Sequence, residues 1–278
     1  MDRKYFIEPE KCIEDIVSWI KTYFADFEPN TKAIIGMSGG KDSTVAAALL
    51  VRALGPDRVI GAIMPNITPQ APLDKTSKDT IEICESLGIQ HYVLPIGDIV
   101  TSLYHALPSY VMSEEGVFNN TPPRVRMSVL YGLAAANHGR VVNTCNKSEI
   151  YVGWETKWGD NVGDFSLFQN YLATQVVEIG LAMPELEVGW VRRTPDDGLC
   201  GMSDEEKFGF TYKELDDYIL NRVVPKDAKT LYKIRQMKKA AYHKKSSVHL
   251  TAPPAKLSWN IDDKSVQTFY QGQDEWEF

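Results

Sequence analysis

The chain has 278 residues, 44% of them hydrophobic and 24% charged, which is typical of a soluble enzyme with a sizeable core. Its formal net charge of −7 argues against a general nucleic-acid-binding surface, and no apolar run is long enough to span a membrane. The first residues lack the apolar segment of a signal peptide, and the four cysteines lie far apart, so we expect a cytoplasmic protein with reduced cysteines.

Up to residue 144 the pattern alternates between helices and short strands rich in β-branched residues. Such alternation is typical of an α/β fold with a doubly wound parallel sheet and helices on both faces. Ligands of such a sheet bind beyond the carboxyl ends of the strands, where this sequence places Ser38, Met64 and Thr144. The expected helices cover residues 9–27, 42–54, 73–87, 98–112 and 123–138, and the expected strands cover residues 32–37, 58–64, 91–94 and 140–144.

The pattern changes after about residue 185. Irregular segments with proline and glycine are followed by Ser203, a predicted helix N-cap, and by helices expected at 212–220 and 229–243. No flexible linker separates these parts. We therefore expect a single domain over residues 1–278, with a core at about 10–245 and a C-terminal extension at about 246–278.

The most informative segment runs from Ile34 to Thr44, where an apolar strand ends in small residues and a helix begins directly after. Glycines and serines let the backbone approach an anion, and the free N–H groups of the new helix point toward it, which predicts a phosphate-binding loop. The common NTPase loop has serine or threonine after its lysine, whereas Asp42 follows Lys41 here. An acid beside bound phosphate requires a cation such as Mg²⁺ between them. An ordinary glycine-rich turn is the alternative interpretation.

Two further segments carry polar groups suited to ligand binding. Residues 120–127 hold Arg124 and Arg126 at the expected start of a helix, and arginine binds phosphate or carboxylate through a planar fork. Residues 143–164 begin at the end of a strand and combine Glu149 with glycine, aspartate, lysine and tryptophan. Loops of this composition at the edge of a sheet commonly bind ligands.

The run Ser-Gly-Gly-x-Asp-Ser at residues 38–43 resembles the loop of the N-type ATP pyrophosphatases, which cleave ATP to AMP and PPi. More of the chain, over roughly residues 10–245, is similar to ammonia-dependent NAD⁺ synthetase. This resemblance implies a Rossmann-like fold of the adenine nucleotide alpha hydrolase type. It also implies a ligase that joins deamido-NAD⁺, ATP and ammonia into NAD⁺, AMP and PPi through an adenylated carboxylate. The matching segments follow in order: 36–43, 120–127, Thr144, Glu149, 156–160, 204–205, 209–218 and 243–244.

The resemblance also implies roles for individual residues. Asp42 and Glu149 would bind Mg²⁺. From the chemistry of the reaction we further predict that Lys41 stabilises the departing pyrophosphate and that Asp160 accepts a proton from ammonium. The family is homodimeric, which makes the helices within 98–138 candidates for an interface. The residues implied for ATP are Gly36, Met37, Ser38, Gly39, Gly40, Lys41, Asp42, Ser43, Met64 and Thr144, and those implied for deamido-NAD⁺ are Arg124, Lys157, Asp164, His243 and Lys244.

One position departs from the family pattern, and two other functions stay open. Many relatives carry an ATP-binding lysine where this chain has Ala173, and we hypothesise that Lys41 or a second metal ion offsets the missing charge. One alternative is another ATP pyrophosphatase, either a tRNA-modifying enzyme or a different amide-forming ligase. The other is a non-catalytic nucleotide sensor. Because the synthetase region begins near residue 10, the expected nitrogen donor is free ammonia, unless a separate partner chain supplies it.

Overall fold

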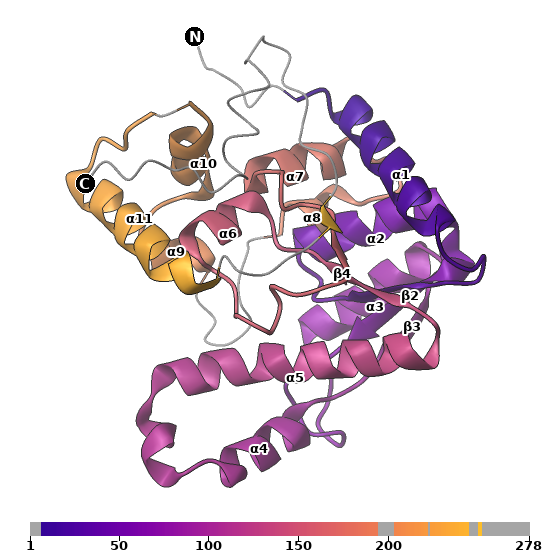
Figure 1. Cartoon of the computed structure of the whole chain (residues 1–278), viewed down its shortest axis with the longest axis horizontal. Coiled ribbons are helices and arrows are strands. Elements are labelled where there is room, and N and C mark those ends of the chain that lie inside the picture. The colour runs from indigo at the N-terminus through magenta and orange to yellow at the C-terminus, as the bar shows by residue number, and fades with distance from the viewer. Residues whose placement is uncertain (1–6, 194–202, 222, 245–249, 252–278) are drawn as a thin grey trace.

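The computed structural model describes residues 7–193, 203–221, 223–244 and 250–251, and it contains a sheet of six parallel strands (Figure 1). The strand order is β3-β2-β1-β4-β5-β6, so the direction of winding reverses between β1 and β4. Ligands of open α/β sheets bind at such a reversal, beyond the carboxyl ends of the strands. The strands are β1 (Ala33–Gly36), β2 (Val59–Ile63), β3 (Gln90–Val93), β4 (Arg140–Asn143), β5 (Phe165–Ser166) and β6 (Leu250–Thr251).

Helices cover both faces of the sheet, which confirms the predicted doubly wound fold. One face carries α1 (Pro9–Ala25), α2 (Lys41–Leu54), α3 (Lys75–Ser86), α7 (Ala173–Leu181) and α8 (Val188–Val191). The other face carries α4 (Gly97–Ala106) and α5 (Glu115–Ala136). The remaining elements are α6 (Lys147–Val152), α9 (Asp204–Phe208), α10 (Tyr212–Asn221), α11 (Ala228–Ala240) and the 3₁₀ turns η1 (Pro56–Arg58), η2 (Ser109–Ser113) and η3 (Ala241–Lys244).

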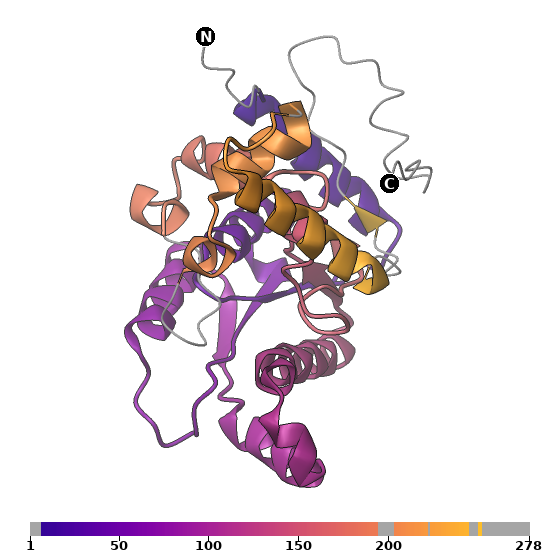
Figure 2. The same ribbon diagram turned by 90° about the vertical axis from the view of Figure 1, so that its left-hand side faces the viewer.

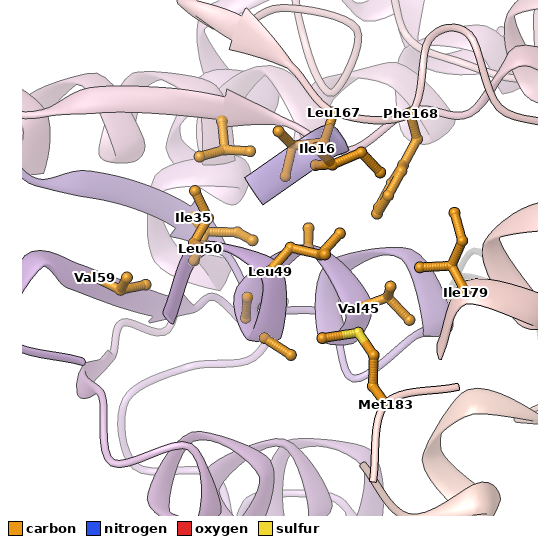
Figure 3. Close-up of a cluster of buried hydrophobic side chains, with 14 of the residues drawn as sticks. Ile16, Ile35, Val45, Leu49, Leu50, Val59, Leu167, Phe168, Ile179 and Met183 are labelled. Atoms are coloured by element: carbon orange, nitrogen blue, oxygen red, sulfur yellow. The ribbon is translucent and has the colours of Figure 1, made fainter. Parts of the chain in front are cut away.

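Successive residues of β1 pack on opposite faces of the sheet. Ile35 belongs to the main core cluster with Ile16 of α1 and Leu49 of α2 (Figure 3), whereas Ile34 packs with Ile60 and with α5 on the other face. Side chains of a strand alternate between faces, so a strand covered on both sides is apolar throughout. The position of β1 at the centre of the sheet therefore explains its sequence and holds the loop that follows it.

Helix α5 begins at Glu115, so the predicted start at residue 123 was wrong. Pro122 and Pro123 lie inside the helix, although proline has no N–H to donate to the carbonyl four residues earlier. For Pro122 that carbonyl belongs to Phe118, and it accepts a hydrogen bond from the Tyr104 hydroxyl at 3.4 Å instead. Arg124 consequently lies in the middle of a long helix and not at its first turn.

A smaller cluster of helices lies beside the carboxyl edge of the sheet (Figure 2). Helices α10 and α11 pack on α6, which follows β4 after a short turn. Ser203 caps α9 as predicted, because its hydroxyl accepts the Glu206 N–H at 3.2 Å. No helix in the described part of the chain has the length and apolar character needed to cross a bilayer.

Candidate active site

The predicted phosphate loop follows β1 and leads into α2. The N–H of Met37 still donates to Ala62 in the neighbouring strand, and Gly39 then turns the chain with a φ of +76°. The N–H of Gly40 donates to the Ser38 hydroxyl at 3.2 Å, and the Ser43 hydroxyl donates to the Gly40 carbonyl at 3.1 Å. These bonds close the loop on itself. Gly40, the N-cap, has no side chain to occupy the free N–H groups of the first helical turn, so they can bind an anion.

The two acids predicted to bind Mg²⁺ share one neighbour, Asn146. The Asn146 side chain donates to Asp42 Oδ1 at 3.3 Å, and its backbone N–H donates to Glu149 Oε2 at 3.0 Å. Burial, and next the charge of Asp42, raises the pKa of Glu149 well above its ordinary value. Two carboxylates that repel each other in this way provide a favourable place for a cation.

The chemistry of this pair fits Mg²⁺. Among the residues that the structure describes, no group of three or more His, Cys, Asp or Glu side chains is arranged to hold a metal ion. Mg²⁺ is commonly held by one or two carboxylates, with water and substrate phosphate as its other ligands. Asp42 and Glu149 at the phosphate loop supply that donor set.

Lys41 is buried at the same place, with its Nζ 2.6 Å from Asp42 Oδ2 and 5.4 Å from the ring centre of Tyr212. Burial alone would lower the pKa of Lys41, but the nearby carboxylates of Asp42, Glu149 and Asp204 outweigh it and raise the pKa. Lys41 therefore keeps its charge at physiological pH. That charge is directed at the acids of the predicted metal site.

Ala173, the position that departs from the family pattern, is buried at the first residue of α7. Its N–H donates to the Ser148 hydroxyl at 3.0 Å, and Asp216 accepts the next N–H, from Thr174, at 3.0 Å. Burial raises the pKa of Asp216 to about 6, while hydrogen bonds from Ser148 and Thr174 and the charge of Lys41 oppose this rise. Compensation by Lys41 for a missing lysine at Ala173 stays a prediction.

Most of the residues predicted to bind the dinucleotide lie together, between α5, the loop after α6, and η3. Arg124 Nε donates to the Lys157 carbonyl at 3.2 Å, and Lys157 Nζ donates to the His243 carbonyl. Lys244 Nζ donates to the Gly153 carbonyl at 2.7 Å. Asp164 is held apart from this group, because its Oδ2 accepts the Val141 N–H in β4 at 2.6 Å.

Met64 and Thr144 directly follow β2 and β4, at the carboxyl edge of the sheet. Met64 is buried, its methyl group lies 3.5 Å from where a Cβ on Gly36 would be, and its carbonyl accepts a hydrogen bond from Arg126 Nε at 3.0 Å. Thr144 is half-buried. Residues predicted for ATP thus lie at the carboxyl edge of the sheet, where ligands of a parallel α/β fold bind.

Two acids lie in the loop after α6. Asp160 is exposed, and its Oδ1 accepts the Thr156 N–H at 2.6 Å, so part of its role is to close the loop. Glu155 is half-buried, and burial followed by the charge of Asp160 raises its pKa from 4.5 to about 7, against the opposing effects of Lys244 and Asn161. Glu155 is not among the residues predicted from the sequence. Its position in the loop at residues 143–164, already predicted to bind a ligand, could have indicated a role in the site.

Comparison with known proteins identifies the family. The family model described as NAD synthase matches residues 12–249. The chain belongs to the NAD synthase family. A curated relative named NH(3)-dependent NAD(+) synthetase, from Methanoregula boonei, is 35% identical over 189 residues, which are 68% of this chain and 74% of the relative. A relative of the same name from Archaeoglobus fulgidus is 32% identical over 243 residues, which are 85% of this chain and 94% of the relative.

Solved structures of the NAD synthase fold agree with the architecture described above. NMN synthetase from Francisella tularensis has a TM-score of 0.74 and 28% identity, and the match covers 92% of this chain and all of that one, 100%. NH3-dependent NAD synthetase from Campylobacter jejuni has a TM-score of 0.66 at 19% identity, over 88% of this chain and 99% of that one. The predicted family, the Rossmann-like fold and the assignment to a family of ligases are thereby confirmed.

Proposed function

We propose that this NAD synthase family member amidates deamido-NAD⁺ with ammonia and consumes ATP, releasing NAD⁺, AMP and PPi. The observation that carries the proposal is the junction at the strand edge. There the phosphate loop and the acid pair held by Asn146 lie beside β4, and the group formed by Arg124, Lys157 and Lys244 lies beyond the same strand. One bound nucleotide and one bound dinucleotide would thus meet at Thr144.

The first step activates the nicotinate carboxylate, which resists ammonia because it is anionic and has no good leaving group. Its oxygen attacks the α-phosphorus of ATP, and the bond to the pyrophosphate breaks. The N–H groups at the start of α2 and the charge of Lys41 stabilise the negative charge that grows on the departing pyrophosphate. Mg²⁺, bound by Asp42 and Glu149, would neutralise phosphate charge at the same place.

The second step needs ammonia in its neutral form, so a nearby base must take a proton from ammonium or from the attacking nitrogen. We assign this role to Glu155 together with Asp160. The Cys145 thiol, next to Thr144, donates to the Asp160 carbonyl at 3.3 Å, so this loop lies close to the junction of the two sites. Burial, followed by the charges of Asp160, Glu149 and Glu155, raises the pKa of Cys145. A carboxylate with a pKa of about 7 accepts a proton efficiently near neutral pH.

Glu155→Gln should therefore change the pH dependence of amidation. In the wild-type protein, kcat/KM calculated for the NH₃ concentration should rise as pH increases through about 7, because Glu155 loses its proton there. In the variant this rise should disappear, and kcat/KM for NH₃ should fall about 10²-fold above pH 7.5. Adenylation, followed as exchange of labelled PPi into ATP without ammonium, should be unchanged.

Stability gives an independent check of the same group. Because the folded protein holds a proton on Glu155 between about pH 4.5 and 7 that the unfolded chain releases, the free energy of unfolding should fall across that range. Glu155→Gln should remove this part of the slope. Glu187→Gln, at an exposed position, is the matched control for both measurements. A wild-type pH profile in Glu155→Gln would contradict the assignment.

The overall activity is tested by incubating the protein with ATP, Mg²⁺, deamido-NAD⁺ and ammonium, followed by detection of NAD⁺, AMP and PPi. ADP as the product would contradict the proposal, and turnover with glutamine alone would overturn the choice of free ammonia. Since one structural relative is named NMN synthetase, a parallel reaction should contain nicotinate mononucleotide as the acceptor. Binding of ATP without any PPi release would favour a nucleotide sensor.

We also propose that the protein is a homodimer associated through α4, η2 and the beginning of α5. Helix α4 and the beginning of α5 extend away from the sheet (Figure 1). Large apolar side chains are exposed there, including Ile99 at 50%, Leu103 at 42% and Tyr110 at 77%. Exposed apolar groups gathered on neighbouring elements are typical of interaction surfaces. Leu103→Asp should convert a dimer to a monomer in light-scattering measurements, whereas Val188→Asp, at an exposed position on α8, should not.

A further inference from the structure

Arg193 connects three segments that are distant in the sequence. It lies just after α8, and its Nη1 donates a hydrogen bond to the Gly39 carbonyl in the phosphate loop at 3.0 Å. Its Nη2 pairs with Asp79 Oδ2 in α3 at 2.5 Å. Both side chains of the ion pair are only about one-fifth exposed, at 23% and 21%.

The contact with Gly39 fixes the orientation of the peptide between Gly39 and Gly40. In a trans peptide the carbonyl and the following N–H point in opposite directions. Arg193 holds the carbonyl on one side, and the Ser38 hydroxyl accepts the Gly40 N–H on the other. Both residues of this peptide are glycines, which can rotate with little steric resistance. Without Arg193 the peptide could turn its carbonyl toward the bound phosphate and repel it.

The ion pair with Asp79 suits a positioning role better than direct binding of phosphate. Asp79 balances the charge of the guanidinium and fixes its plane, with Lys75 Nζ at 3.9 Å as a second, exposed cation near Asp79. Both side chains of the pair keep contact with water, so breaking it leaves neither charge fully buried. The main effect of Arg193 should therefore appear in the phosphate loop and not in global stability.

We propose that Arg193 is a positioning residue that holds the Gly39–Gly40 peptide in the orientation that binds the pyrophosphate part of ATP. This inference rests on the proposed function, since it assumes that the loop binds ATP. The affinity of the loop for pyrophosphate would then depend on Arg193, a residue outside the loop. Arg193 also connects the loop to α3 and to the end of α8.

The test compares binding of Mg²⁺–PPi and of AMP by isothermal titration calorimetry in the full-length protein. Arg193→Met should weaken binding of Mg²⁺–PPi about 10- to 100-fold, as for loss of a hydrogen bond to a charged group, and leave AMP binding unchanged. Arg193→Lys should restore part of the affinity, because lysine keeps one donor and the charge. Arg192→Met, an exposed arginine next in the chain, is the matched control and should bind both ligands normally.

A second variant separates positioning from charge. Asp79→Asn keeps Arg193 but frees its guanidinium, so Mg²⁺–PPi binding should weaken severalfold if orientation matters and strengthen if Arg193 binds phosphate directly. Equal loss of PPi and AMP binding with a lowered Tm in Arg193→Met, or binding indistinguishable from that of Arg192→Met, would overturn the proposal. The measurement needs no turnover, so a protein that makes no NAD⁺ but shows the Arg193 dependence would contradict the proposed function alone.

Discussion

Asp42→Asn and Glu149→Gln should each lower kcat for NAD⁺ formation by about 10²- to 10³-fold, the usual cost of losing one group that stabilises charge in the transition state. Both carboxylates belong to the predicted Mg²⁺ site, where Asn146 holds them by separate hydrogen bonds. Either amide keeps the shape of the side chain but loses the negative charge that attracts the metal ion. The Mg²⁺ concentration needed for half-maximal activity should rise in both variants.

Thermal unfolding should distinguish the two variants. Burial, and next the charge of Asp42, raises the pKa of Glu149, so the native state contains repulsion that an amide relieves. We expect Tm without Mg²⁺ to stay the same or to rise in Glu149→Gln, whereas Asp42→Asn, which removes the partner of buried Lys41 at 2.6 Å, should lower Tm. Because both acids serve one ion, the double variant should be little worse than either single one. Additive losses of activity would argue against a shared ion, and Asp98→Asn, at an exposed position, is the control.

Gly39→Ala should weaken ATP binding about 100-fold or more and lower the free energy of unfolding by about 1–3 kcal/mol. The φ of Gly39 is +76°, a left-handed conformation that alanine rarely adopts. A Cβ there would lie 2.3 Å from the Thr80 hydroxyl and 2.8 Å from Arg193 Nη1. The loop would have to shift away from α3, and the N–H groups at the start of α2 would lose their alignment. Titration with ATP and chemical denaturation measure the two effects.

A companion variant and a control sharpen this second test. Thr80→Ala, combined with Gly39→Ala, removes one of the two close contacts of the new Cβ but leaves the backbone strain. The double variant should therefore regain only part of the ATP affinity that Gly39→Ala loses. Gly132→Ala places its Cβ in open space inside α5 and should be neutral or slightly stabilising. Full ATP affinity in Gly39→Ala would show that the loop does not need its left-handed turn.

The features that could be predicted from the sequence were local. A short run of glycines and serines with Asp42 predicts the phosphate loop. Short apolar runs predict the buried strands at the centre of the sheet. The start of α5 was mispredicted because the carbonyl that Pro122 leaves free accepts a hydrogen bond from the Tyr104 hydroxyl of another helix. Nothing in the sequence around Pro122 indicates that contact. β5 and β6, of two residues each, are too short to show an alternating pattern.

The site was only partly predictable for the same reason. Arg193 acts through Gly39, more than 150 positions away, and nothing near residue 193 indicates that contact. The raised pKa of Glu155 depends on burial and on Asp160, which only the folded loop supplies. The roles assigned to Asp164, Lys41 and the other site residues remain predictions. The structure brings most of the dinucleotide residues together but leaves Asp164 bonded to β4.

The continuity of α5 has a consequence for an assembled pair of subunits. Phe118, exposed near the beginning of this helix, and Arg124, which donates a hydrogen bond to the Lys157 carbonyl, lie on the same helix. A shift of the beginning of α5 on contact with a second subunit would therefore also move the guanidinium of Arg124. Binding of deamido-NAD⁺ at the predicted dinucleotide site should therefore change the dimer dissociation constant, and dimerisation should change the affinity for the dinucleotide by the same factor.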